Sequence, residues 1–513
     1  MAMELNQNLY LSVLWCLIFT LIAFKLIRTR TNKSNLPPSP PKLPIIGNLH
    51  RLGKLPHRSF QSLSKKFGPL MLLHLGQTPT LVVSSADLAR EMAKTNNDIV
   101  FSDRPSNTAS RILFYGHNKD LSFAPYGQEW RQRRKISVLE LLSTKRVRSY
   151  HSIREEEVSE LVRKIQEARK SCVSVNLTLF LVESSNNVVS RCIFGHKDEA
   201  DDLDGKSSTK SFGEIVKKVT HHFGEFSFGD FFPSLWWMDF ITGLVPRMKS
   251  TFKELDAFMN QVVAEHKYGT RNNENKDIVD ILLQLQHDAR DDDDLGLSLD
   301  SIKAILLDLF AGGSETTSTT LEWAMAELMR HPEKMKKAQE EVRTVVEKKK
   351  KNKSRIDEDD VSQMSYLKCV VKETLRLHNP PALITRETNS TVKLGGYDIP
   401  PQTMVTVNAW AIQRDHDQWE RPEEFVPERF ENSKVDFKGQ NFQFIPFGFG
   451  RRGCPGLLFG VASIEYTLSN LLYWFDWKLP EEDIDMSETI GLTVNKKLPL
   501  HLQPVPYYFC PKI

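Results

Sequence analysis

Cysteine is scarce in this sequence: there are six among 513 residues, and no two of them form a C-x-x-C pair. So sparse a set excludes a disulfide framework and the paired-thiolate motifs of zinc and redox sites. An excess of one charge is also lacking, since 68 Lys and Arg residues face 65 Asp and Glu residues, a net charge of +3. This balance argues against nucleic acid as a partner.

One long apolar run lies near the N-terminus, from Leu9 to Ile27, and is interrupted only by Lys25. About 20 such residues are enough to span a bilayer. Basic residues follow at once: Arg28, Arg30 and Lys33. Positive charge on this side predicts a single-pass anchor over residues 9–27, with residues 1–8 in the lumen and the rest of the chain in the cytosol. A cleaved signal peptide is disfavoured because its positive charge would precede the apolar run and an A-x-A site would follow it.

Residues 28–48 combine this basic stop with a proline-rich segment that begins Pro37-Pro38-Ser39-Pro40-Pro41. Such proline density predicts a stiff, extended hinge, which its position after an anchor favours over an SH3-type ligand. The body, residues 49–513, contains no internal repeat and no interdomain linker. We expect one large domain, mainly α with a minor β-sheet region. Its strands are expected near Leu70–Leu75, Thr80–Ser84, Thr391–Ile399 and Thr403–Val407.

A helix is predicted over Leu299–Arg330, capped near Ser298 and stopped by Pro332. Two glycines, Gly312 and Gly313, lie in its middle, and each costs about 1 kcal/mol against alanine. Either the close approach of a ligand or tight packing against a neighbouring helix would explain them.

The segment from Pro446 to Gly456 surrounds Cys454 with four glycines and two arginines, and a helix is predicted from Leu457 to about Phe475. Backbone N–H groups and positive charge favour a thiolate, which suits a soft metal ligand. The other cysteines are expected to be ordinary thiols: Cys16, Cys172, Cys192, Cys369 and Cys510.

The same segment also matches a dinucleotide fingerprint, G-x-G-x-x-G, through Gly448, Gly450 and Gly453, after a predicted strand at Asn441–Pro446. Too little chain follows for the further strand–helix units that a dinucleotide fold requires. The metal-ligand interpretation is therefore favoured.

The Cys454 segment resembles the haem-binding signature of the cytochromes P-450, F-x-x-G-x-R-x-C-x-G. It is met in full by Phe447, Gly450, Arg452, Cys454 and Gly456. Four further motifs are similar to those of the family and follow in its order: W-x-x-x-R at Trp130 and Arg134, oxygen activation at Gly313–Thr317, E-x-x-R at Glu373 and Arg376, and P-E-R-F with Arg429. The hinge and the stretches Ala124–Gly127 and Glu140–Ser143 resemble the plant A-type microsomal group.

The resemblance implies the cytochrome P-450 fold and haem b, iron protoporphyrin IX, with Cys454 as the iron ligand. It implies that Thr316 hydrogen-bonds dioxygen and that Glu315 helps to deliver protons through water. The implied cofactor-binding residues are Trp130, Arg134, Arg386, Phe447, Gly450, Arg452 and Gly456. The implied structural ion triad consists of Glu373, Arg376 and Arg429.

A flavoprotein reductase that supplies electrons from NADPH is the implied partner. We expect it to dock on a basic surface formed by Arg131, Arg133, Lys135 and Arg451. The implied substrate pocket is apolar and contains Ile112, Phe114, Leu309, Gly312, Leu383, Ile384 and Leu492. The run Phe223–Phe240, with Trp236 and Trp237, either dips into the membrane or belongs to the core.

The predicted function is an NADPH- and O2-dependent monooxygenase at the endoplasmic reticulum membrane. It would hydroxylate or epoxidise a lipophilic plant metabolite such as a terpenoid or alkaloid. One alternative is desaturation, oxidative coupling or rearrangement of a phenylpropanoid, coumarin or related metabolite. An alternative of another class is a membrane-tethered haem sensor without turnover, although the intact Glu315–Thr316 pair favours oxygen chemistry.

Overall fold

The computed structural model describes residues 15–16, 20, 35–116, 118–171, 174–195, 208–268, 276–288, 297–349, 356–480 and 483–507. Within them, most of the chain is helical. The α-helices are α2 (Pro56–Phe67), α3 (Ala86–Met92), α4 (Thr95–Val100), α5 (Thr108–Leu113), α6 (Gln128–Ile136), α7 (Thr144–Ser149), α8 (His151–Ser171), α9 (Leu177–Phe194), α10 (Ser208–His222), α11 (Phe228–Phe231), α12 (Met238–Ile241), α13 (Leu244–Tyr268), α14 (Ile278–Asp288), α15 (Leu299–Arg330), α16 (Pro332–Lys349), α17 (Glu358–Ser362), α18 (Ser365–Leu377), α19 (Ala409–Ile412) and α20 (Leu457–Trp474).

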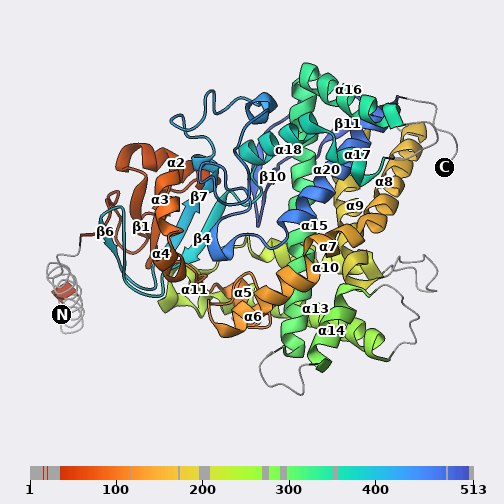
Figure 1. Cartoon of the computed structure of the whole chain (residues 1–513). Coiled ribbons are helices and arrows are strands. Elements are labelled where there is room, and N and C mark those ends of the chain that lie inside the picture. The colour runs from red at the N-terminus through yellow and green to blue at the C-terminus, as the bar shows by residue number, and fades with distance from the viewer. Residues whose placement is uncertain are drawn as a thin grey trace, which may run out of the picture.

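The strands form small separate sheets: β1, β4, β6 and β7 lie on one side of the molecule, β10 lies near its middle, and β11 lies among the helices on the other side (Figure 1). They are β1 (Leu70–Leu75), β2 (Thr78–Val83), β3 (Val175–Asn176), β4 (Leu383–Glu387), β5 (Val392–Leu394), β6 (Tyr397–Ile399), β7 (Met404–Asn408), β8 (Phe475–Lys478), β9 (Glu488–Ile490), β10 (Val494–Lys496) and β11 (His501–Pro506). The largest sheet has the order β1-β2-β7-β4, with β2 and β7 parallel and the other pairs antiparallel. The four predicted strand regions are confirmed within a few residues.

The long helix α15 runs through the middle of the helical part (Figure 1) and has the predicted bounds. The Ser298 hydroxyl accepts a hydrogen bond from the Ser301 amide, as expected of an N-cap. Its buried side chains enter two apolar clusters, one that contains Leu321 and Met325 and another that contains Ile305 and Phe310. The helix therefore divides the core, and both halves of the core depend on it.

The predicted strand at Asn441–Pro446 is wrong, because the structure has turns there instead. The Phe444 amide donates to the Asn441 carbonyl at 2.8 Å, and the Ile445 amide donates to the Gln413 side chain at 3.0 Å. These bonds satisfy the backbone locally and with a side chain, so no partner strand is needed.

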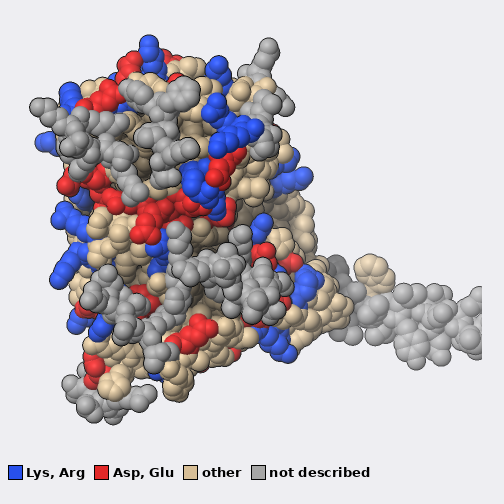
Figure 2. Space-filling model, turned by 90° about the vertical axis from the view of Figure 1, so that its right-hand side faces the viewer, with Lys and Arg blue, Asp and Glu red and all other residues tan. Residues whose placement is uncertain are grey.

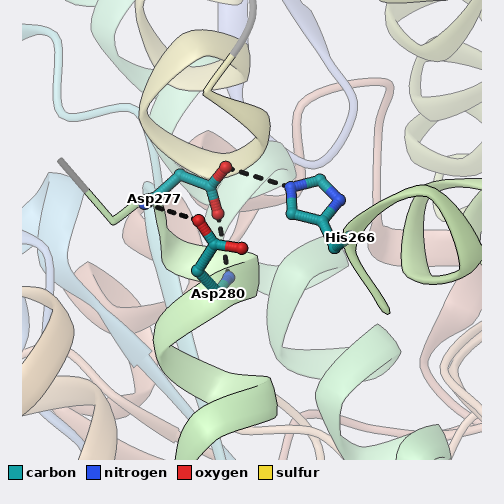
Figure 3. A group of neighbouring side chains, drawn as sticks. All are labelled: His266, Asp277 and Asp280. Carbon is teal, nitrogen blue, oxygen red and sulfur yellow. Dashed lines mark hydrogen bonds and ion pairs between the residues drawn. The ribbon is translucent and has the colours of Figure 1, made fainter. Parts of the chain in front are cut away.

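His266, Asp277 and Asp280 lie together where α13 ends and α14 begins (Figure 3). The Asp277 carboxylate accepts a hydrogen bond from the Asp280 amide at 2.9 Å, and the Asp280 carboxylate accepts one from the Asp277 amide at 3.4 Å. His266 Nε2 lies 3.0 Å from Asp277 Oδ2. Reciprocal capping of this kind fixes the start of α14, and the histidine ties that cap to α13.

Acidic side chains gather across the face that contains α8, and basic side chains lie around them (Figure 2). Many of the charges on α8 are paired: Arg163 lies 2.6 Å from Glu160, and Glu156 lies 2.7 Å from Arg191 of α9. Local pairing of this kind agrees with the small net charge of the chain.

Among the residues that the structure describes, no helix has both the length and the apolar character needed to cross a membrane. The predicted anchor, residues 9–27, lies outside them except for three helical residues, Trp15, Cys16 and Thr20. Of the other cysteines, Cys192 and Cys369 are buried, Cys16 is exposed, and Cys172 and Cys510 lie outside the described ranges.

Candidate active site

Cys454 lies in a loop that turns into α20. Its amide donates to the Phe447 carbonyl at 2.8 Å, and Gly448 and Gly450 adopt φ values of 72° and 62°. Side chains other than glycine are strained in this left-handed region, so these two glycines give the loop its shape. The loop holds the sulfur in place before the first turn of α20.

Cys454 is an exposed residue, although protein surrounds its thiol closely. Burial raises the pKa of the thiol, while a hydrogen bond from the Gly456 amide and the charge of Arg134 act in the opposite direction. An exposed residue in such dense surroundings indicates an internal space beside it rather than the outer surface. A nearby apolar side chain, Leu458, is 43% exposed, as expected of a residue that lines the same space.

The helix α15 packs against the start of α20, beside this space. Gly312 is exposed although most of the helix is buried, and a Cβ placed on it would meet no atom within 4 Å. On Gly313, a Cβ would lie 3.2 Å from Val189 Cγ2 of α9 and 3.9 Å from Phe459 Cε1 of α20. The structure therefore contains both explanations for the glycine pair: open space at Gly312 and tight helix packing at Gly313.

Glu315 and Thr316 follow directly on α15. The Thr316 hydroxyl donates to the Gly312 carbonyl at 2.7 Å, so one backbone acceptor of the helix is shared with a side chain. Glu315 Oε1 accepts hydrogen bonds from Thr493 Oγ1 at 2.5 Å and from Asn495 Nδ2 at 3.4 Å. Thr493 follows Leu492, a residue of the implied substrate pocket, whereas no motif in the sequence marks Asn495.

Four arginines gather around the Cys454 loop: Arg104, Arg134, Arg386 and Arg452. Burial, together with the charges of Arg104 and Arg452, lowers the pKa of Arg386 well below its ordinary value. Burial and the charge of Arg104 also lower the pKa of Arg452 to about 9, so this side chain still carries its charge at neutral pH. The cluster is a concentration of buried positive charge that an anion would stabilise.

Two of these arginines have buried N–H groups that are not paired in a hydrogen bond among the described residues. Arg104 Nε and Arg386 Nη1 are buried and have no hydrogen-bond partner within the described part of the chain. Arg452, in contrast, donates to the carbonyls of Ser102, Leu121 and Ala124. Arg134 Nη2 donates to the Gly453 carbonyl at 2.6 Å. Unsatisfied buried donors beside a thiol that faces open space fit a planar cofactor with two carboxylates. Arg104 was not predicted, because no motif marks it.

Trp130 lies beneath this cluster, and its indole N–H donates to the Leu121 carbonyl at 3.0 Å. Arg452 lies over the indole ring at 4.1 Å. In this arrangement Trp130 supports the segment that Arg452 also binds.

Glu373, Arg376 and Arg429 are brought together behind the loop. Arg376 donates to both oxygens of Glu373, at 2.7 and 2.9 Å, and Arg429 Nε donates to Glu373 Oε1 at 2.9 Å. Arg376 also donates to the carbonyls of Gln413 and Pro422. The group therefore joins α18 to the irregular chain that leads to Cys454.

Ile112, Phe114 and Leu309 belong to one apolar cluster, which also contains Phe459. Leu383 and Ile384 are consecutive on β4 and therefore point to opposite faces of the sheet. Leu383 packs against the cluster of Phe60 and Met71, whereas Ile384 packs with Phe449. The two side chains consequently cannot line the same side of one pocket.

The expected basic surface needs one correction. Arg131 and Lys135 are exposed on α6, and Arg451 is exposed and lies 3.2 Å from Asp98. Arg133 is buried, and it donates to the Asn118 carbonyl at 2.6 Å. Because it lies on the inner face of α6, it cannot contribute to a docking surface.

Comparison with known proteins agrees with this geometry. The family model described as Cytochrome P450 matches residues 37–503. The phenylacetaldehyde oxime monooxygenase of Prunus mume is 51% identical over 98% of this chain and 95% of its own length. The strychnine-11-hydroxylase of Strychnos nux-vomica is 47% identical over 96% of this chain and 95% of its own length. A zebrafish cytochrome P450 solved with progesterone has a TM-score of 0.74 at 25% identity, and the match covers 88% of this chain and 100% of that chain.

The chain belongs to the cytochrome P450 family, and the two relatives named above come from plants. It is a monooxygenase that uses haem and receives electrons from NADPH through a reductase. The mainly helical fold with small sheets is the fold of that family.

Proposed function

We propose that this monooxygenase hydroxylates or epoxidises a small lipophilic plant metabolite, such as an alkaloid or a terpenoid. The observation that carries the proposal is the exposure of Gly312 in the middle of a buried helix, on the helix that packs beside Cys454. The neighbouring residues Ile112, Phe114 and Leu309 are apolar, which suits a substrate held by shape rather than by charge. The names of an oxime monooxygenase and a strychnine hydroxylase among the relatives support a specialised metabolite as substrate.

In this proposal Cys454 ligates the haem iron. Haem, when bound, supplies the activation of dioxygen. Arg386, Arg104 and Arg134 would hold its carboxylates with charge-assisted hydrogen bonds, the first two through donors that have no partner in the part of the chain that the structure describes. Arg452 fixes the loop around Cys454 through three backbone carbonyls.

Thr316 and Glu315 would hold and deliver protons for the oxygen chemistry. The Thr316 hydroxyl donates to Gly312 and can still accept a hydrogen bond, so it can orient a water molecule in the open space. Glu315 lies beside it with a carboxylate that can take up and release a proton. The presence of both Glu315 and Thr316 favours a monooxygenase over a haem sensor without turnover.

We also propose that the protein lies on the endoplasmic reticulum membrane, with residues 9–27 as its anchor and the catalytic domain in the cytosol. Apolar side chains are exposed on the α11–α12 region and on the hinge: Trp236, Trp237, Phe240, Ile241 and Ile45. The β1–β2 turn links these two segments, since Gln77 donates to Phe231 at 2.8 Å and Gly76 donates to Ile46 at 3.2 Å. Exposed tryptophans next to apolar residues are typical of a membrane-contacting surface. The alternative that the run Phe223–Phe240 belongs to the core is wrong for Trp236, Trp237 and Phe240, because these side chains are exposed.

Expression of the whole chain in microsomes that contain a plant reductase tests the proposal. The reduced, carbon monoxide-bound difference spectrum should show the red-shifted thiolate band, and Cys454→Ala should abolish it. Incubation with NADPH and a panel of alkaloids, terpenoids and phenylacetaldehyde oxime should give a product that has gained one oxygen atom. A normal spectrum without any NADPH-dependent product across the panel would favour the sensor.

A further inference from the structure

The hairpin of β9 and β10 reaches the catalytic helix from the far end of the chain. In the register of the hairpin Val494 faces Ile490 and Asn495 faces Thr489, with Gly491–Thr493 as the turn. Thr493 and Asn495 are two residues apart, so their side chains point to the same face. Glu315 and Thr319 are four residues apart on α15 and also share a face. The hairpin face with Thr493 and Asn495 packs against the α15 face with Glu315 and Thr319.

The hydrogen bonds between them define the orientation of each group. The Thr319 hydroxyl donates to Asn495 Oδ1, which leaves the Asn495 amide N–H2 directed at Glu315. The Thr493 hydroxyl has a single proton and two acceptors in reach, Glu315 Oε1 at 2.5 Å and Asn495 Oδ1 at 3.2 Å. The shorter bond, to a carboxylate, is the stronger one, so the Thr493 hydroxyl donates its hydrogen bond to Glu315 Oε1.

Both bonds end on the same carboxylate oxygen. Oε1 of Glu315 receives Thr493 and Asn495, whereas Oε2 forms no hydrogen bond within the described ranges. The Glu315 side chain is partly exposed. One oxygen is thus anchored and the other is available for proton exchange with water.

The hairpin itself is held rigidly enough to act as an anchor. The Val494 amide donates to the Pro380 carbonyl at 2.9 Å, and the Trp323 indole donates to the Val494 carbonyl at 3.1 Å. At the base of the hairpin, Glu488 accepts from Arg58 at 2.9 Å and lies 3.2 Å from His57. Helices α2 and α15 therefore fix the hairpin at both ends.

We propose that Thr493 and Asn495 are positioning residues for proton delivery, which hold Glu315 by one oxygen so that the other serves the active site. The proposal rests on the proton-delivery role of Glu315 given under the proposed function. Leu492, which is 39% exposed at the tip of the turn, precedes Thr493 directly. A substrate that contacts Leu492 would therefore lie next to Thr493. The same short turn would contact the substrate and orient Glu315.

The test compares Thr493→Val, Asn495→Leu and the double variant with the wild type, in full-length enzyme with its reductase and a substrate that the wild type converts. Removing the anchor should lower kcat and the product formed per NADPH by about tenfold, which is less than the roughly 100- to 10,000-fold of general acid catalysis because the Glu315 carboxylate itself remains, and KM should change little. Peroxide release should rise in proportion. Thr493→Ser keeps the hydroxyl and should restore most of the coupling.

Thr489→Val is the matched control, because it removes an exposed hydroxyl from the same hairpin that forms no bond to α15 in the described structure. A double-mutant cycle with Glu315→Gln separates positioning from packing. If Thr493 acts through Glu315, Thr493→Val should cost little more in the Glu315→Gln background.

Unchanged coupling in the double variant, or fully additive effects with Glu315→Gln, would overturn the inference. A wild type with a normal difference spectrum but no turnover would instead overturn the proposed function. A parallel fall of haem content and thermal midpoint in Thr493→Val and Thr493→Ser would show that the hairpin acts through folding, and would also overturn the positioning role.

Discussion

Gly312 and Gly313 are neighbours on α15, yet they face opposite environments. A Cβ on Gly312 would enter open space, whereas one on Gly313 would lie 3.2 Å from Val189 Cγ2. The two glycines therefore have different structural roles: Gly312 leaves open space beside the helix, and Gly313 allows α9 to approach closely.

This difference predicts opposite outcomes for two alanine variants. Gly312→Ala should keep the fold, because alanine favours a helix by about 1 kcal/mol, but it should weaken substrate binding and turnover. Gly313→Ala should lower the thermal midpoint relative to Gly312→Ala, since overpacking costs about 1–3 kcal/mol. Combining Gly313→Ala with Val189→Ala should relieve the clash. Equal thermal midpoints for the two single variants would contradict this assignment.

Arg386 should hold the cofactor. Replacing it with leucine removes a charge-assisted hydrogen-bond donor, which should weaken haem binding by about 2 kcal/mol. The haem content of the purified protein and the rate of haem transfer to apomyoglobin measure the effect. Arg131→Gln, on the exposed face of α6, is the control and should retain full haem content. Full haem retention in Arg386→Leu would remove Arg386 from the cofactor-binding set.

The Glu373 group should be essential for folding. Glu373→Gln leaves Arg376 and Arg429 buried without their counter-charge, and breaking a buried pair in this way costs about 3–5 kcal/mol. We expect little correctly folded haem protein, measured by the red-shifted carbon monoxide band. Glu420→Gln is the matched control, since its pair with Arg421 is exposed and worth at most about 1 kcal/mol. A normal yield for Glu373→Gln would show that the group is dispensable.

Asp120 and Asp308 should make stability depend on pH. Burial raises the pKa of Asp120 to about 6, and burial together with the charge of Asp120 raises the pKa of Asp308 well above its ordinary value. Asp308 accepts from the Leu121 amide at 2.6 Å and from the Ser122 hydroxyl at 2.5 Å, while Arg104 and Arg452 also face Asp120. The two carboxyls resist ionising together.

Because the folded pKa of Asp120 lies above the unfolded value of 3.8, the folded state holds its proton more tightly. The stability from this group is complete at low pH and is lost as pH rises from about 4 to about 6. Asp308→Asn keeps the shape and removes one charge, so it should flatten this dependence. Thermal midpoints of the two proteins across this pH range measure the difference, and parallel curves would contradict the coupling.

The sequence predicts α15 with its true ends because the signals are local: an N-cap at Ser298, an apolar helical period and Pro332 at the end. Cys454 stands out for the same reason, since its glycines and arginines are adjacent in the chain. The strand expected at Asn441–Pro446 fails because apolar residues there pack as turns and bond to Gln413, which no local pattern reveals.

Residues that act over long sequence distances are the ones that the sequence could not identify. Asn495 meets Glu315 across 180 residues, and Arg104 meets Thr385 across 281 residues. Arg133 and Arg131 are both basic residues of α6, but the turn of the helix buries only the former. Contacts and burial of this kind depend on tertiary packing, which a single sequence does not reveal directly.

The β9–β10 hairpin has a consequence for how the protein is made. Glu488 bonds to His57, 431 residues earlier, and Thr493 bonds to Glu315, 178 residues earlier. A ribosome releases residues 488–496 long after α2 and α15 have emerged, so Glu315 lacks its hydrogen bonds from Thr493 and Asn495 until then. The hydrogen bonds that orient Glu315 therefore form only after nearly the whole chain has been synthesised.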